Sequence, residues 1–203
     1  MSAFLGPIHF WLYNKIKIQN EIVEDILSFA ENNNLIPDLR KNLYEKYADG
    51  DLKPLEEVID TNNIHGWLQG RVIEVESKLA VSVTEILKNS ADKIDELKDI
   101  FRSKGAEVSP LNNNSTLQDV FKAVNDTLLD GMPCDRANEV VSQEDDNIIW
   151  KRNVCVHEDY WNASGGDIKN YYLLREEFIK GLLSEADINY EKLDEVTSKI
   201  SRR

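Results

Sequence analysis

The feature that most constrains the fold is a long run of apolar residues at helical spacing between Asn63 and Ser103. Steps of four, three and four residues repeat three times through ten positions, nine of them apolar: Leu68, Val72, Val75, Leu79, Val83, Ile86, Ser90, Ile94, Leu97 and Phe101. The eleven-residue repeat corresponds to about 3.67 residues per turn, close to the period of a straight α-helix. The sequence therefore predicts one continuous helix over 63–103, on the order of 60 Å long, that Gly105 ends.

Shorter amphipathic patterns on both sides of this segment predict further helices. Asn residues, glycines and prolines separate them, and a capping box at 115–118 opens one of them. The predicted helices occupy residues 8–31, 37–47, 54–60, 117–128, 168–182 and 189–200. We expect the helices to pack as an antiparallel bundle around the long one.

Residues 139–143 and 148–157 flank an acidic turn and alternate in polarity as the two strands of a β-hairpin do. The predicted fold is therefore mainly α (α+β), an antiparallel helical bundle with a small hairpin near residues 139–157. A chain of this length suits a single domain. Within it we expect 1–131 to form the bundle, and 132–203 to form the hairpin with the C-terminal helices packed on it.

The chain carries 37 acidic and 24 basic residues, a net charge of −13. A surface of this charge repels phosphate backbones and anionic headgroups, so we expect no nucleic-acid and no membrane partner. The sequence has only two cysteines, no basic segment ahead of its first apolar stretch and no apolar run near 18 residues. These features predict a cytoplasmic protein.

The predicted long helix is longer than its neighbours, which leaves apolar surface between residues 86 and 101 that only the next helix can cover. A second copy of the chain could cover the remainder. The sequence therefore predicts a homodimer.

Two histidines are expected at one end of the bundle. His9 lies on the apolar stripe of the first helix and His65 lies at the start of the long helix, so an antiparallel return between them brings both together. An ionisable ring on an apolar stripe is costly without a partner. Cys155 and His157, two residues apart on a strand, point the same way and could complete a tetrahedral site. Imidazole and thiolate ligands suit zinc or iron.

Aromatic residues accompany each histidine and predict the walls of a ligand pocket. Trp11, Trp67 and Trp161 each follow a histidine closely in the sequence. Tyr171 and Arg175 lie on one stripe of a later helix, where they could bind a carboxylate. The alternative for all these residues is structural: tryptophans near helix ends pack, and single buried histidines bond to carbonyl groups.

These patterns favour a protein that binds a metal ion or a small ligand in a pocket lined by His, Trp and Cys. One alternative is a small-molecule hydrolase or transferase that uses Cys155 or a histidine-bound metal, with Lys151 and His157 on the same strand face lowering the thiol pKa. Another is a helical dimerisation or interaction module with structural histidines. The sequence leaves open whether the protein is an enzyme.

Overall fold

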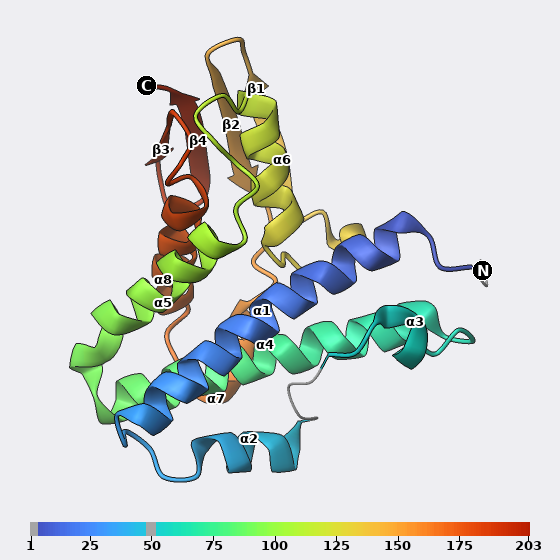
Figure 1. Ribbon diagram of the computed structural model, residues 1–203, viewed down its shortest axis with the longest axis vertical. Helices are drawn as coiled ribbons and strands as arrows, with labels where there is room; N and C mark the ends of the chain where they lie inside the picture. The colour runs from blue at the N-terminus through green and yellow to red at the C-terminus, as the bar shows by residue number, and fades with distance from the viewer. Residues whose placement is uncertain (1–3, 48–51) are drawn as a thin grey trace.

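The computed structural model describes residues 4–47 and 52–203. Asp49-Gly50, which the sequence predicts to separate the helices over 37–47 and 54–60, lies outside the described residues. The described chain forms eight α-helices and a four-stranded antiparallel sheet, which confirms the mainly α (α+β) fold (Figure 1). None of the described helices is both long and apolar enough to cross a membrane.

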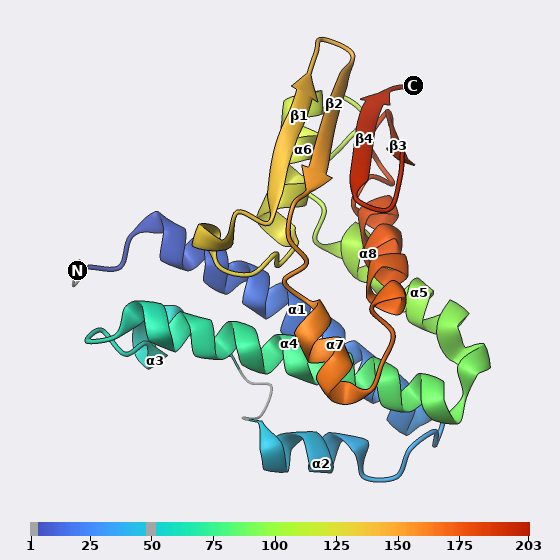
Figure 2. The same ribbon diagram turned by 180° about the vertical axis from the view of Figure 1, so that it is seen from behind.

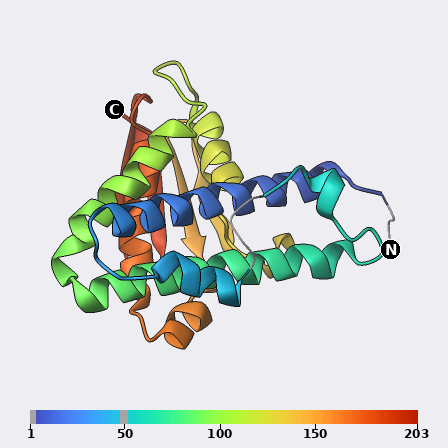
Figure 3. The same cartoon turned by 60° about the horizontal axis from the view of Figure 1, so that its bottom comes forward.

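Two helices of equal length, α1 (Pro7–Asn32) and α4 (Ile64–Asn89), lie side by side and begin at the same end of the molecule (Figures 1 and 3). The chain returns between them through two short helices, α2 (Leu39–Lys46) and α3 (Leu55–Val58). Pro7 suits the first position of α1, and the Asn63 side chain accepts a hydrogen bond from the Gly66 amide at the start of α4. The predicted apolar stripes of both helices are buried against each other.

The prediction of one continuous helix over 63–103 is wrong. The helix breaks at Ser90, whose backbone leaves the helical region, and a short 3-10 turn at Ala91–Lys93 leads into α5 (Ile94–Glu107). Ser90 is the one polar residue in the apolar series. Since α1 and α4 end together, a straight continuation would carry Leu97 and Phe101 beyond the cover of α1, and the break instead buries both. Burying each is worth roughly 1.5–3 kcal/mol, which favours the bend.

The second half of the chain builds the sheet and the helices beside it. α6 (Leu117–Thr127) is capped by Thr116 and Asp119, and α7 (Glu158–Ser164) packs on α4 while α8 (Ile168–Leu182) packs on α5. The four strands follow the order β1-β2-β4-β3, and α6 covers one face of the sheet (Figures 1 and 2). They are β1 (Asn138–Gln143), β2 (Asn147–Arg152), β3 (Ile188–Lys192) and β4 (Thr197–Arg202).

The predicted hairpin at 139–157 corresponds to β1 and β2, except that β2 ends at Arg152. The predicted helix over 189–200 is wrong, because this segment forms the β3–β4 hairpin. Its turn is held by the Asp194 carboxylate, which accepts hydrogen bonds from the amides of Val196 and Thr197, each at 2.8 Å. β4 also pairs with β2, a long-range partner that helical spacing cannot reveal.

The break in the long helix also removes the reason for expecting a dimer. Within residues 86–101, Ile86, Leu97 and Phe101 are buried inside the same chain, where α4 and α5 pack on α1 and α5 packs on α8. The homodimer stays a prediction, without the uncovered apolar surface that motivated it.

Candidate functional site

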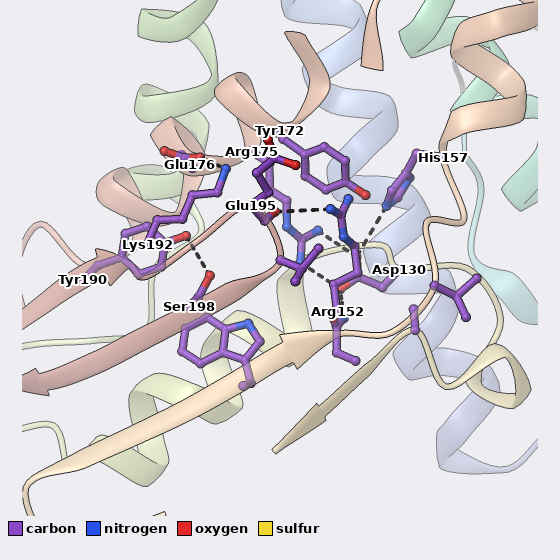
Figure 4. Close-up of a pocket in the computed structure, with 15 residues that line it drawn as sticks. Asp130, Arg152, His157, Tyr172, Arg175, Glu176, Tyr190, Lys192, Glu195 and Ser198 are labelled. Atoms are coloured by element: carbon purple, nitrogen blue, oxygen red, sulfur yellow. Dashed lines mark hydrogen bonds and ion pairs between the residues drawn. The ribbon is translucent and has the colours of Figure 1, made fainter. Parts of the chain in front are cut away.

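A hollow beside the sheet lies between α8, the segment before α7 and the β3–β4 turn. An outer cavity of about 530 Å³ adjoins an inner polar cavity of about 40 Å³ that Figure 4 shows in close-up. Because the two cavities share lining residues, we treat them as one site and call it the sheet pocket. The shared residues are Arg152, Tyr172, Glu176, Lys192 and Glu195.

The sheet supplies one wall of this pocket through alternate residues of three strands. Trp150 in β2 pairs in register with Ser198 in β4, and Ser198 pairs with Lys192 in β3. Side chains at paired positions point to the same face of a sheet, and so does Arg152, two residues beyond Trp150. All four line the inner cavity.

Arg152 is held at the junction of the two cavities. Its guanidinium carbon lies 3.8 Å from the ring centroid of Tyr172, and its Nη2 donates to the backbone oxygen of Glu195 at 3.2 Å. No carboxylate in the described chain lies within ion-pair distance of this guanidinium. The Tyr172 hydroxyl donates to the Cys155 sulfur at 3.1 Å, and burial raises the pKa of Tyr172, which keeps it a donor. The cation therefore has a fixed position and free hydrogen-bond donors.

The floor of the inner cavity is a buried network of alternating charges. The Arg175 guanidinium donates to both oxygens of Asp130, at 2.7 and 2.9 Å. His157 places Nε2 at 3.5 Å from the same carboxylate and Nδ1 at 3.0 Å from Glu76 in α4. Gln19 in α1 donates to the other oxygen of Glu76 at 3.0 Å. The network joins the pocket floor to the α1–α4 pair.

Neighbouring opposite charges shift the pKa values of His157 and Asp130 toward their ionised forms. Burial alone would lower the pKa of His157, but Glu76 and Asp130 outweigh burial and raise it to about 9. Burial would raise the pKa of Asp130, but Arg175 and His157 hold it well below its ordinary value. With His157 cationic, the two cations balance the two carboxylates.

The predicted four-ligand metal site is not assembled. His9 and His65 do come together, in a separate pocket of about 210 Å³ at the shared start of α1 and α4 that Cys134 also lines. Cys155 lies in the sheet pocket, and both ring nitrogens of His157 face carboxylates. Across residues 4–47 and 52–203, no group of three or more His, Cys, Asp or Glu side chains is arranged to hold a metal ion. Zinc or iron therefore stays a prediction without a ligand set.

The three tryptophans predicted to line the site pack elsewhere. The Trp11 indole donates to Asp126 at 2.8 Å, Trp67 packs on Tyr13, and Trp161 is fully buried beside Tyr171. None of the three lines the sheet pocket.

Tyr171 and Arg175 lie at or near the pocket floor in structural roles. The Tyr171 ring stacks on His157 with centroids 4.0 Å apart, and Arg175 lines the inner cavity but is already paired with Asp130. The sequence led us to expect that Arg175 could bind the carboxylate of a ligand, but its guanidinium is already occupied by Asp130. The predicted Cys155–His157 nucleophile also loses its base, because the imidazole is held by Glu76 and Asp130.

Sequence reasoning selected Cys155, His157 and Arg175, which line the sheet pocket, but missed Arg152, Lys192 and Ser198. Arg152 continues the face of Ile148 and Trp150 on a strand, and a charged residue at the end of an apolar face was an available signal. Lys192 and Ser198 were hidden by assigning their segment to a helix. Comparison of the chain with protein-family models, with curated proteins and with solved structures finds no match.

Proposed function

We propose that this protein binds a small molecule in the sheet pocket, and that the molecule carries a carboxylate bound by Arg152. The observation that supports this is a guanidinium fixed on an aromatic ring at the junction of two cavities, with no carboxylate of the described residues within ion-pair distance of it. The outer cavity, at about 530 Å³, has the size of a small-molecule site. Cys134 and Cys155 are both free thiols, which fits a reducing, cytoplasmic setting.

The chemistry of arginine explains why a carboxylate is the expected partner. A guanidinium has five N–H donors in a rigid fork that matches the two oxygens of a carboxylate, and Glu195 takes only one of them. The Tyr172 ring holds the fork in place before the ligand arrives, which reduces the entropy lost on binding. A hydrogen bond to a charged group is worth about 1.5–3 kcal/mol, or roughly 10- to 100-fold in affinity.

Cys155 allows a direct test, because it lies in the wall of the outer cavity whereas Cys134 lies outside it. Ile168 and Leu173 also line this cavity, so 3-phenylpropionate is a suitable carboxylate and 3-phenylpropanol its uncharged counterpart. We expect millimolar 3-phenylpropionate to slow iodoacetamide labelling of Cys155 but not of Cys134, and 3-phenylpropanol to protect neither. Peptide mass spectrometry over a concentration series gives the apparent Kd.

Two neighbouring substitutions sharpen this test. Arg152→Met is expected to weaken protection by 3-phenylpropionate about tenfold or more, while Arg152→Lys keeps part of it. Lys151→Met removes a cation from the same strand but from the opposite face, and should leave protection unchanged. Equal protection in the Arg152→Met and Lys151→Met proteins would contradict the proposal, provided that circular dichroism shows both to be folded.

A further inference from the structure

Three acidic residues line the outer cavity beside its cations: Glu158, Glu176 and Glu195. We infer that the ligand of the sheet pocket is a zwitterion of the amino-acid type, whose ammonium group is bound by Glu195 next to the carboxylate on Arg152. The inference rests on the proposed function and adds the second charge of the ligand.

The charged residues of the outer cavity balance once their internal pair is removed. Lys192 is neutralised by Glu176, with Nζ and Oε1 2.7 Å apart. This leaves two cations, Arg152 and Lys169, and two carboxylates, Glu158 and Glu195, in the lining of the same cavity. Nowhere in the described parts of the chain does a side chain pair with either of these two carboxylates. The cavity therefore presents unpaired charges of both signs.

A ligand with only one charge would fit this cavity poorly. A ligand with only a negative charge would be repelled by the unpaired carboxylates in the lining of the cavity. A ligand with only a positive charge would be repelled by the Arg152 guanidinium. A zwitterion satisfies both signs at once. The protein as a whole has a net charge of −13, so a cavity with balanced charge stands apart from the surrounding surface.

Glu195 is the acidic lining residue whose main chain contacts Arg152. Its backbone oxygen accepts the hydrogen bond from the guanidinium, so the backbone of Glu195 lies beside Arg152, and its side chain lines the same cavity (Figure 4). Adjacent carboxylate and ammonium binding groups suit an α-amino acid, in which one carbon carries both groups. Ile168 and Leu173 in the same cavity favour an apolar side chain.

Four compounds that differ by one group each test this inference by the same Cys155 protection measurement. L-Phenylalanine adds an ammonium group to 3-phenylpropionate, N-acetyl-L-phenylalanine blocks that group, and L-phenylalaninamide removes the carboxylate. We expect L-phenylalanine to bind about fivefold more tightly than 3-phenylpropionate and N-acetyl-L-phenylalanine. We expect L-phenylalaninamide to bind at least tenfold more weakly than L-phenylalanine.

Substitutions at two glutamates test whether Glu195 binds the ammonium group of the ligand. Glu195→Gln should remove the preference for L-phenylalanine over 3-phenylpropionate without weakening 3-phenylpropionate itself. Glu191→Gln, an acidic position of β3 whose side chain points to the other face than Lys192, should change neither affinity.

The outcomes separate the two proposals. If 3-phenylpropionate protects Cys155 and L-phenylalanine is no better, the zwitterion is wrong and the carboxylate site stands. If the preference survives in Glu195→Gln, the assignment to Glu195 is wrong. If no compound protects Cys155, both proposals fail.

Discussion

Replacing Gly181 with alanine is expected to lower the free energy of unfolding by about 3 kcal/mol or more. A Cβ atom at this position would lie 1.9 Å from the backbone oxygen of Arg102 and 2.8 Å from its carbonyl carbon. Backbone atoms cannot turn aside as a side chain can, so α8 and α5 would have to separate. Overpacking a well-packed site usually costs about 1–3 kcal/mol, and a clash with backbone belongs at or beyond the upper end.

Gly105 makes the equivalent close contact from α5 to the backbone of α8. A Cβ on Gly105 in α5 would lie 2.1 Å from the backbone oxygen of Phe178 in α8, so each helix presents a glycine to the backbone of the other. The sequence led us to predict that Gly105 ends its helix, and this prediction is wrong, because the helix continues to Glu107. The close crossing fixes α8, and α8 carries the Tyr172 and Arg175 side chains of the sheet pocket.

Urea unfolding followed by circular dichroism measures this effect, and Gly70→Ala is its control. Gly70 lies inside α4 with no atom within 4 Å of the position of an added Cβ. There alanine should stabilise the protein by about 0.5–1 kcal/mol, because glycine is the weaker helix former. The two substitutions are chemically identical and opposite in expected sign. A Gly181→Ala protein as stable as the Gly70→Ala protein would show that α5 and α8 do not touch through their backbones.

The sequence predicted the helices whose stripes are buried along their whole length. Residues 8–31 and 168–182 nearly match α1 and α8, because their helical period is not interrupted and a proline or an Asp cap marks their starts. It failed where a distant partner decides the outcome. The apolar series from Leu68 to Phe101 is compatible with a straight helix; the end of α1 at Asn32 and the packing of α5 on α8 make the bend at Ser90 favourable.

The site was harder to predict than the fold, for a related reason. Histidines and tryptophans were chosen because they are rare and chemically capable, yet His157 and Trp161 are buried structural groups. The sheet pocket instead depends on the register of β2 with β4 and of β4 with β3, which brings Arg152 near Lys192 across forty residues of sequence. No local pattern in the sequence records that register.

Replacing His157 with leucine is the second large effect, with an expected loss of about 3–5 kcal/mol in the free energy of unfolding. The ring is 2 % exposed and lies between the carboxylates of Glu76 and Asp130. Removing one partner of a buried ion pair leaves an uncompensated charge, which accounts for a cost of that order.

The double substitution Glu76→Gln with His157→Leu should cost less than the two single substitutions added together, because it removes charges of both signs. Additive costs would show that the two groups do not interact.

The same histidine gives stability a defined dependence on pH. Its pKa is about 9 in the folded chain against an ordinary value of 6.5, so its contribution is complete below pH 6.5 and is lost as pH rises through 9. From pH 6.5 to 8 this loss is about 1.5 kcal/mol. His157→Gln should abolish it, which pH-dependent urea unfolding can measure.

Lys15 has the opposite effect on the free energy of unfolding at higher pH. We therefore expect the stability of the wild-type protein to level off as the pH rises. Burial lowers the pKa of Lys15 to about 8, with Asp130 opposing the shift, from an ordinary value of 10.5. The unfolded chain therefore holds the extra proton above pH 8, and stability rises with pH over the range in which the His157 contribution is falling. The two slopes nearly cancel between pH 8 and 9.

Lys15→Met should remove the levelling, so that stability continues to fall to pH 9, whereas His157→Gln should leave only the rise. A wild-type profile that falls without a plateau would mean that Lys15 is charged in the folded protein.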